Sequence, residues 1–123
     1  MTSLTAASRP TVAVTLAHYF PARIPNLFTI LAACQTSTVP PSEVLIWNND
    51  APFPPTVLTQ LHAAGASVIQ SPKTLGCQGR LLAALLTDAD ESLTLGNDTV
   101  PDPEMNANLL QWRRKYPDAV LTL

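Results

Sequence analysis

Two short runs of the sequence are apolar and β-branched along most of their length: Thr11–Ala17 (TVAVTLA) and Glu43–Trp47 (EVLIW). Such continuous runs are typical of strands that are covered on both faces of a sheet. Weaker strand patterns follow at Ala66–Gln70, Ser92–Leu95 and Ala119–Leu123. A chain with strands of this kind needs helices on each side of its sheet.

Helical patterns lie between the predicted strands. In Asn26–Thr36, apolar residues recur at the spacing of one helix face: Leu27, Ile30, Leu31 and Cys34. A second helix is predicted over Pro54–Ala64 and stops before Gly65. A third is predicted over Gln78–Leu86, and its apolar residues are Leu81, Leu82, Leu85 and Leu86. A fourth is predicted over Pro103–Lys115, with Asp102 placed to cap it.

The strand and helix patterns alternate as β-α-β-α-β-α-β-α-β. This order predicts an α/β fold with a mostly parallel, Rossmann-like sheet and helices on both faces. A length of 123 residues suits one domain with one core. We expect a flexible N-terminus over residues 1–10 and the domain over residues 11–123. The 46% hydrophobic composition disfavours disorder, and twelve prolines exclude a long coiled coil.

The sequence contains no apolar run near the ~18 residues that cross a bilayer. Met1–Pro10 lacks the basic region and apolar stretch of a secretory signal. We therefore expect no transmembrane segment, a cytoplasmic location, and two buried, reduced thiols at Cys34 and Cys77. The net charge of −2 disfavours a general nucleic-acid surface. Asp88 to Glu104 holds six of the nine acids and no base, so a bound cation is expected there.

The segment Leu93–Pro103 (LTLGNDTVPDP) places a carboxylate where a ligand would bind. In parallel sheets, ligands gather at the carboxyl ends of the strands, and Asp98 follows directly after a predicted strand. A carboxylate there suits Mg²⁺ or Mn²⁺, which favour oxygen ligands and keep waters for a phosphate partner. The alternative is that Asp98 only shapes the turn.

The segment Ser71–Arg80 (SPKTLGCQGR) combines cations with glycines ahead of a predicted helix. Lys73 and Arg80 are suited to phosphate oxygens, and Gly76 lets the backbone approach a ligand closely. The alternative is a surface loop with solvated cations. The segment lacks the spacing of a dinucleotide fingerprint or a P-loop.

Polar and aromatic residues follow the first two predicted strands. Asn48 and Asn49 carry amides that suit a base or a ribose, although Asn-Asn-Asp is also ordinary turn chemistry. His18 and Tyr19 end the first strand, where an aromatic ring suits a planar ligand or simple packing. The sequence has no nucleophile motif of a hydrolase.

Together, these segments resemble the nucleotide-sugar-binding half of a family-2 glycosyltransferase with the glycosyltransferase-A (GT-A) fold. In that family the first strand ends in a motif like I-P-T-Y-N, and Leu16–Phe20 (LAHYF) keeps the tyrosine. The second strand usually ends in Asp-Asp, where this chain has Asn48-Asn49. A loop like N-x-G before an arginine is similar to Thr74–Gly76 followed by Arg80.

The most specific match is the family's acidic triplet before V-P-D-P. Here it reads Gly96, Asn97 and Asp98, followed by Thr99–Pro103 (TVPDP), with Gly96 in place of the first acid. The resemblance covers roughly residues 11–123, and it implies that Asp98 holds the divalent cation.

The resemblance also implies a donor site for a nucleoside-diphosphate sugar, with Tyr19 and Asn49 along the base and ribose and Arg80 near the diphosphate. His18, Asn48, Gly76 and Asn97 belong to the same motifs. The acceptor is unknown. Inverting members take their catalytic carboxylate from the acceptor-binding half, so no general base is assigned here and the pattern suggests a truncated domain.

Two alternatives remain open at this point. One is a nucleotide-binding module without transfer. The other is an interaction domain that docks or self-associates through an open sheet edge.

Overall fold

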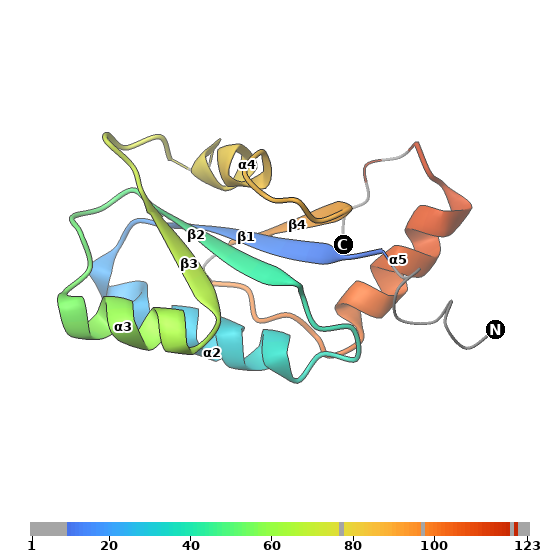
Figure 1. Ribbon diagram of the computed structural model, residues 1–123, viewed down its shortest axis with the longest axis horizontal. Coiled ribbons are helices and arrows are strands. Elements are labelled where there is room, and N and C mark those ends of the chain that lie inside the picture. Colours follow the sequence, from blue (N-terminus) through green and yellow to red (C-terminus); the bar gives the residue numbers. More distant parts are fainter. Residues whose placement is uncertain (1–9, 77, 97, 119, 121–123) are drawn as a thin grey trace.

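The computed structural model describes residues 10–76, 78–96, 98–118 and 120. Within them the chain forms four strands, five helical segments and the loops between them (Figure 1). In chain order these are β1 (Val12–His18), the 3-10 helix η1 (Pro21–Arg23), α2 (Ile24–Gln35), β2 (Glu43–Asn48), α3 (Pro55–Ala63), β3 (Ala66–Gln70), α4 (Gln78–Ala84), β4 (Glu91–Leu95) and α5 (Met105–Lys115).

The four strands form one parallel sheet in the order β3-β2-β1-β4. The predicted α/β fold with a parallel sheet is therefore confirmed. The predicted fifth strand, Ala119–Leu123, and the predicted flexible N-terminus lie outside the described residues, apart from Val120 and Pro10. The same holds for Cys77, whereas Cys34 is buried as expected.

Helices cover both faces of the sheet, as the sequence predicts. In Figure 1, α2 and α3 lie on one face and α4 lies on the other. β1 is buried along nearly its whole length, because it is central in the sheet and covered on both sides. No helix in the described part of the chain has the length and apolar character needed to cross a membrane.

The apolar face predicted for the first long helix is confirmed. Leu27, Ile30, Leu31 and Cys34 of α2 are all buried in the main core, where Leu16 and Ile46 of the central strands are also fully buried. Burying a side chain of this size contributes about 1.5–3 kcal/mol relative to leaving it exposed.

The buried side of α4 is not the one that its large apolar residues would suggest. The helix ends at Ala84, two residues before the predicted end. The four leucines of the predicted helix are 57%, 39%, 79% and 61% exposed: Leu81 and Leu82 in α4, and Leu85 and Leu86 in the turn that follows it. Gly79 and Ala83 face the sheet instead. An ideal Cβ on Gly79 would lie 2.1 Å from Trp47 Cδ1, so the helix backbone packs directly against the indole. Small residues therefore decide which side of α4 is buried.

The start of α5 also differs from the prediction. The helix begins at Met105, two residues after Pro103, and no described side chain caps its first turn. Asp102 Oδ1 instead accepts a hydrogen bond of 2.9 Å from the backbone N–H of Glu104. The helix starts two residues later than predicted, so the Asp102 carboxylate closes a turn ahead of α5 and does not cap the helix.

Candidate functional site

The carboxyl ends of three strands place a polar row at one edge of the sheet. His18, Asn48 and Gln70 are register partners across β1, β2 and β3. Asn48 is fully buried, and its Nδ2 donates to Gln70 Oε1 at 2.8 Å and to the carbonyl of Ala51 at 3.0 Å. Its Oδ1 accepts from the backbone N–H of Asp50. The amide of Asn48 therefore serves the turn and the neighbouring strand, as the turn interpretation expects.

Asn49 lies beside this row and contacts the loop that precedes α4. Its side chain is almost buried, at 7% exposed. Oδ1 accepts from the backbone N–H of Leu75 at 3.0 Å, and Nδ2 donates to the carbonyl of Gly76 at 2.9 Å. Both ends of the Asn49 amide are thus occupied by the chain itself.

His18 and Tyr19 take different positions although they are adjacent in sequence. The His18 ring is buried and lies 5.1 Å from the Phe53 ring, and its Nδ1 has no partner among the described residues. Burial lowers the pKa of His18, and the nearby Asp50 carboxylate offsets part of that effect. Tyr19 is exposed and packs edge-to-face with the exposed ring of Phe20, 4.8 Å away.

Phe20 is an exposed aromatic residue beside the candidate site that the sequence analysis did not single out. It follows Tyr19 directly and its ring is about half exposed, so the end of β1 presents two aromatic rings rather than one. The adjacency of two aromatic residues at a strand end is the signal that points to this pair.

Asp98 and Arg80 come from different elements, and both side chains approach Gly96 at the end of β4. An ideal Cβ on Gly96 would lie 2.8 Å from Asp98 Oδ1 and 3.8 Å from Arg80 Nη1. The bare glycine backbone leaves room for both charged groups beside the strand end. Asn97, the middle residue of the predicted triplet, lies outside the described residues.

The acids between Asp88 and Glu104 do not form one cluster. Glu91 pairs with Arg113 at 3.1 Å, and Asp90 accepts hydrogen bonds from Thr11. Among the described residues, no group of three or more His, Cys, Asp or Glu side chains is arranged to hold a metal ion. Asp98 is the carboxylate beside Gly96, with Thr99 Oγ1 donating to it at 3.4 Å. One carboxylate suits a Mg²⁺ that takes its other ligands from phosphates and water.

The loop before α4 carries Lys73 and Gly76. Lys73 is exposed. Gly76 has a φ of +62°, a backbone conformation that residues other than glycine rarely adopt. Gly76 is therefore required by the path of the backbone into α4.

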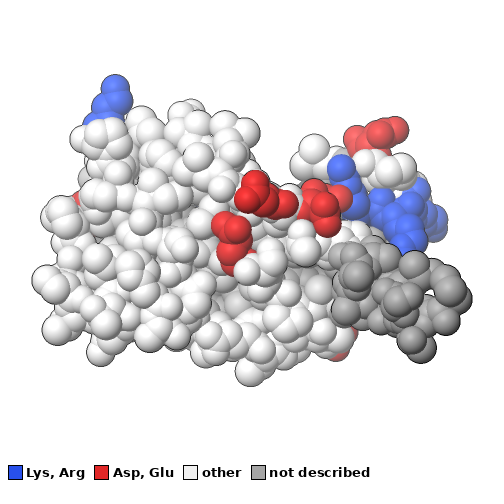
Figure 2. All heavy atoms as spheres, viewed as in Figure 1, with Lys and Arg blue, Asp and Glu red and all other residues white. Residues whose placement is uncertain are grey.

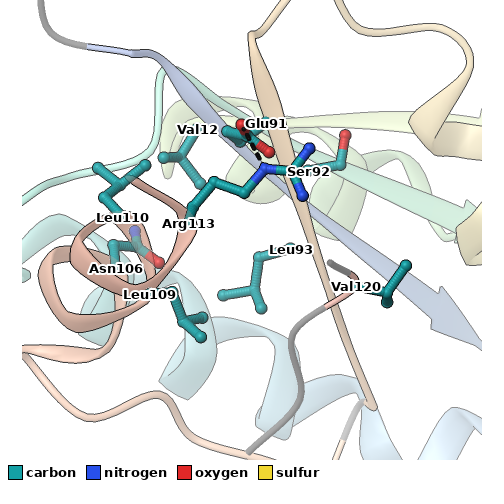
Figure 3. Close-up of a pocket in the computed structure, with 9 residues that line it drawn as sticks. All are labelled: Val12, Glu91, Ser92, Leu93, Asn106, Leu109, Leu110, Arg113 and Val120. Carbon is teal, nitrogen blue, oxygen red and sulfur yellow. Dashed lines mark hydrogen bonds and ion pairs between the residues drawn. The ribbon is translucent and has the colours of Figure 1, made fainter. Parts of the chain in front are cut away.

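A cavity of about 260 Å³ lies away from this site, near the amino ends of β1 and β4 (Figure 3). Val12 and Glu91, the first residues of β1 and β4, take part in its lining. Its walls are mostly apolar, from β4, α5 and their surroundings: Val12, Glu91, Ser92, Leu93, Asn106, Leu109, Leu110, Arg113 and Val120. None of the predicted site residues lines it.

On the face shown in Figure 2, a few acidic side chains lie near the middle, Lys and Arg gather at one end, and most of the remaining surface is uncharged. The last turn of α5 supplies basic residues at that end: Arg113, Arg114 and Lys115. The Lys115 ammonium lies over the stacked rings of Trp112 and Tyr116. This basic group lies on a different element from the candidate site.

The sequence matches no protein-family model and no curated protein. The fold is similar to those of several solved structures, including the following three. The first is residues 1–349 of TarS from S. aureus, with a TM-score of 0.69 and 12% identity, over 87% of this chain and 33% of that one. The second is the mannosyltransferase PcManGT from Pyrobaculum calidifontis in complex with GDP-Man and Mn²⁺, with a TM-score of 0.68 and 20% identity, over 85% of this chain and 32% of that one.

The third structure is CMP:2-keto-3-deoxy-manno-octonic acid synthetase complexed with CTP. It has a TM-score of 0.65 and 17% identity, over 88% of this chain and 49% of that one. At these identities the similarity establishes the fold. The chain has a GT-A-like α/β fold, as the sequence motifs predict, and it spans about a third to a half of these three chains.

Proposed function

We propose that the chain is a glycosyltransferase-like domain that binds a nucleoside-diphosphate sugar with a divalent cation, for glycosyl transfer to an acceptor that is still unknown. The observation that carries the proposal is the approach of Asp98 and Arg80 to Gly96, at the carboxyl edge of a GT-A-like sheet. The similar mannosyltransferase was solved with GDP-Man and Mn²⁺, which supports this choice of ligand class.

Each residue of the site has a distinct role in the proposal. The exposed Tyr19 ring stacks on the base, and the Arg80 guanidinium pairs with the diphosphate. Asp98 holds Mg²⁺ or Mn²⁺, and Asn97 belongs to the same sequence motif. A cation bound there would offset the charge that develops on the nucleoside-diphosphate leaving group.

The buried residues of the site support its exposed ones. His18 and Asn48 form the floor beneath the base, since both are buried at the ends of their strands. Gly76 and Asn49 shape the loop that leads to Arg80. No described residue is assigned as the general base, so the proposal for this chain concerns the donor side of the reaction.

A non-catalytic alternative has its own support. The fold is also similar to a synthetase solved with CTP, so nucleotide binding on this fold does not require glycosyl transfer. The exposed leucines of α4 and the outer strands of the described sheet, β3 and β4, favour an interaction role or self-association.

Calorimetry with UDP, GDP and CDP, with and without Mn²⁺, tests the proposal. We expect the unaltered chain to bind a nucleotide, and Mn²⁺ to strengthen this binding. Asp98→Ala should abolish the binding. Asp88→Ala is the control and should preserve it, because Asp88 is an exposed acid of the same segment. Retained Mn²⁺ dependence in Asp98→Ala would sink the metal role. If the unaltered chain binds none of the three nucleotides, the interaction alternative is favoured instead.

Hydrolysis of the nucleotide sugars then separates transfer from binding. Release of free sugar from GDP-Man or a UDP-sugar by the unaltered chain, reduced in Asp98→Ala, supports an active donor site. Tight binding with no turnover supports the non-catalytic alternative.

A further inference from the structure

We infer that Asn49 is a positioning residue: its side chain holds the Thr74–Gly76 loop and thereby sets where Arg80 stands relative to Asp98. The last part of this inference rests on the proposed function, since it assigns the diphosphate to Arg80. The loop-holding part does not.

Asn49 touches one loop through three separate contacts. Its Oδ1 accepts from the N–H of Leu75 at 3.0 Å, and its Nδ2 donates to the carbonyl of Gly76 at 2.9 Å. Its own carbonyl accepts from Thr74 Oγ1 at 3.1 Å. The side chain therefore pairs with this backbone as a neighbouring strand would, by giving one donor and one acceptor.

This pairing continues into the first turn of α4. The Gly76 carbonyl that accepts from Asn49 also accepts from the N–H of Gly79 at 3.3 Å. Gly79 in turn lies directly against Trp47. The start of α4 is thus held at two points by β2 and the residue that follows it, and Arg80 is the next residue along the helix.

An amide is the group that these contacts require. Leu75 N–H needs an acceptor and the Gly76 carbonyl needs a donor, and asparagine supplies both in one planar group. A carboxylate at this position still accepts from Leu75, but it sets an acceptor against the Gly76 carbonyl. Because both ends of the amide are used and the side chain is 7% exposed, Asn49 is poorly placed to read a base directly.

The loop-holding role is tested without any nucleotide. Limited trypsin digestion at the exposed Lys73–Thr74 bond and hydrogen exchange at the Leu75 amide both report opening of the loop. We expect Asn49→Ala and Asn49→Asp to speed both by about fivefold or more. Asn108→Asp makes the same chemical change on the exposed side of α5 and is expected to leave both rates unchanged.

Binding of Mn²⁺-pyrophosphate separates positioning from base recognition. If Asn49 positions Arg80, its variants weaken the binding of pyrophosphate and of UDP by a similar factor. If Asn49 reads the base, its variants weaken UDP binding and leave pyrophosphate binding and loop opening unchanged, which would overturn the inference.

The two proposals fail in different ways. Unchanged digestion and exchange in both Asn49 variants would overturn the loop-holding role, whatever the nucleotide result. Faster loop opening in a chain that binds neither UDP nor pyrophosphate would support the loop-holding role, overturn its link to a diphosphate, and count against the donor site itself.

Discussion

Gly79 packs so closely against Trp47 that an ideal Cβ on the glycine would lie 2.1 Å from Trp47 Cδ1. The contact joins the first turn of α4 to β2 without any side chain between them. It also turns the leucines of α4 away from the sheet. The packing of α4 against β2 therefore requires a residue without a Cβ atom at position 79.

We predict that Gly79→Ala lowers the free energy of unfolding by about 1–3 kcal/mol, because the added methyl group must displace the indole or the helix. This range is the net effect, after about 1 kcal/mol for the higher helix propensity of alanine has been subtracted from the steric cost. Urea denaturation measures the change. Leu85→Ala is the control, and since Leu85 is 79% exposed we expect its effect to stay within about 0.5 kcal/mol.

We predict that Arg80→Ala weakens the binding of nucleoside diphosphates by about tenfold or more, since a hydrogen bond to a charged group contributes about 1.5–3 kcal/mol. Arg80→Lys keeps the charge but not the planar fork, so an intermediate affinity is expected. Calorimetry measures both variants beside Arg114→Ala, which removes an exposed arginine from the far end of α5. An equal loss in Arg114→Ala would point to general charge attraction rather than a site.

His18 makes the stability of the fold depend on pH. Burial lowers the pKa of His18 from its ordinary value near 6.5, so the folded state keeps the ring neutral where the unfolded chain takes up a proton. The unfolding free energy should therefore fall as the pH drops through 6.5, and this loss is complete below the pKa of the folded state.

Urea denaturation across this pH range measures the effect. His18→Phe should flatten the slope of stability against pH, whereas His62→Gln, at an exposed position of α3, should retain it. A slope in His18→Phe equal to that of the unaltered chain would show that other groups cause the pH dependence.

Cys34 should be unreactive in the folded protein. Its thiol is buried in the main core, and burial raises the pKa of Cys34, so little thiolate forms at mildly alkaline pH. In a Cys77→Ser background, labelling of Cys34 by a thiol reagent should follow global unfolding and accelerate with urea. Rapid labelling of the native chain would mean that α2 opens locally.

Periodicity predicts the parts of this fold whose large side chains face inward. In α2, four apolar residues at helical spacing are all buried, so the pattern alone assigns the face. In α4 the same reasoning fails, because Gly79 and Ala83 let the backbone approach β1 and β2 while the leucines stay outside. The buried side of α4 is decided by how closely its backbone approaches the sheet. The pattern of apolar residues in one sequence does not indicate that distance.

The candidate site divides in a similar way. The motif before V-P-D-P correctly predicts that Asp98 follows a strand end, because strand, turn and helix signals coincide there. The roles of Asn48 and Asn49 stay ambiguous in the sequence, since an amide serves a turn and a ligand equally well. The partners that resolve the ambiguity, Gln70 and Gly76, come from distant parts of the chain.

The polar row at the strand ends also bears on how the strands align during folding. β2 is apolar on both faces, so a shift of one residue against β3 would bury nearly as much of its apolar surface as the native pairing. In such a shift Asn48 would face Ile69 or Ser71 instead of Gln70, and its buried amide would lose a partner at a cost of about 1–3 kcal/mol. The hydrogen bond between Asn48 and Gln70 therefore favours the native register of β2 against β3.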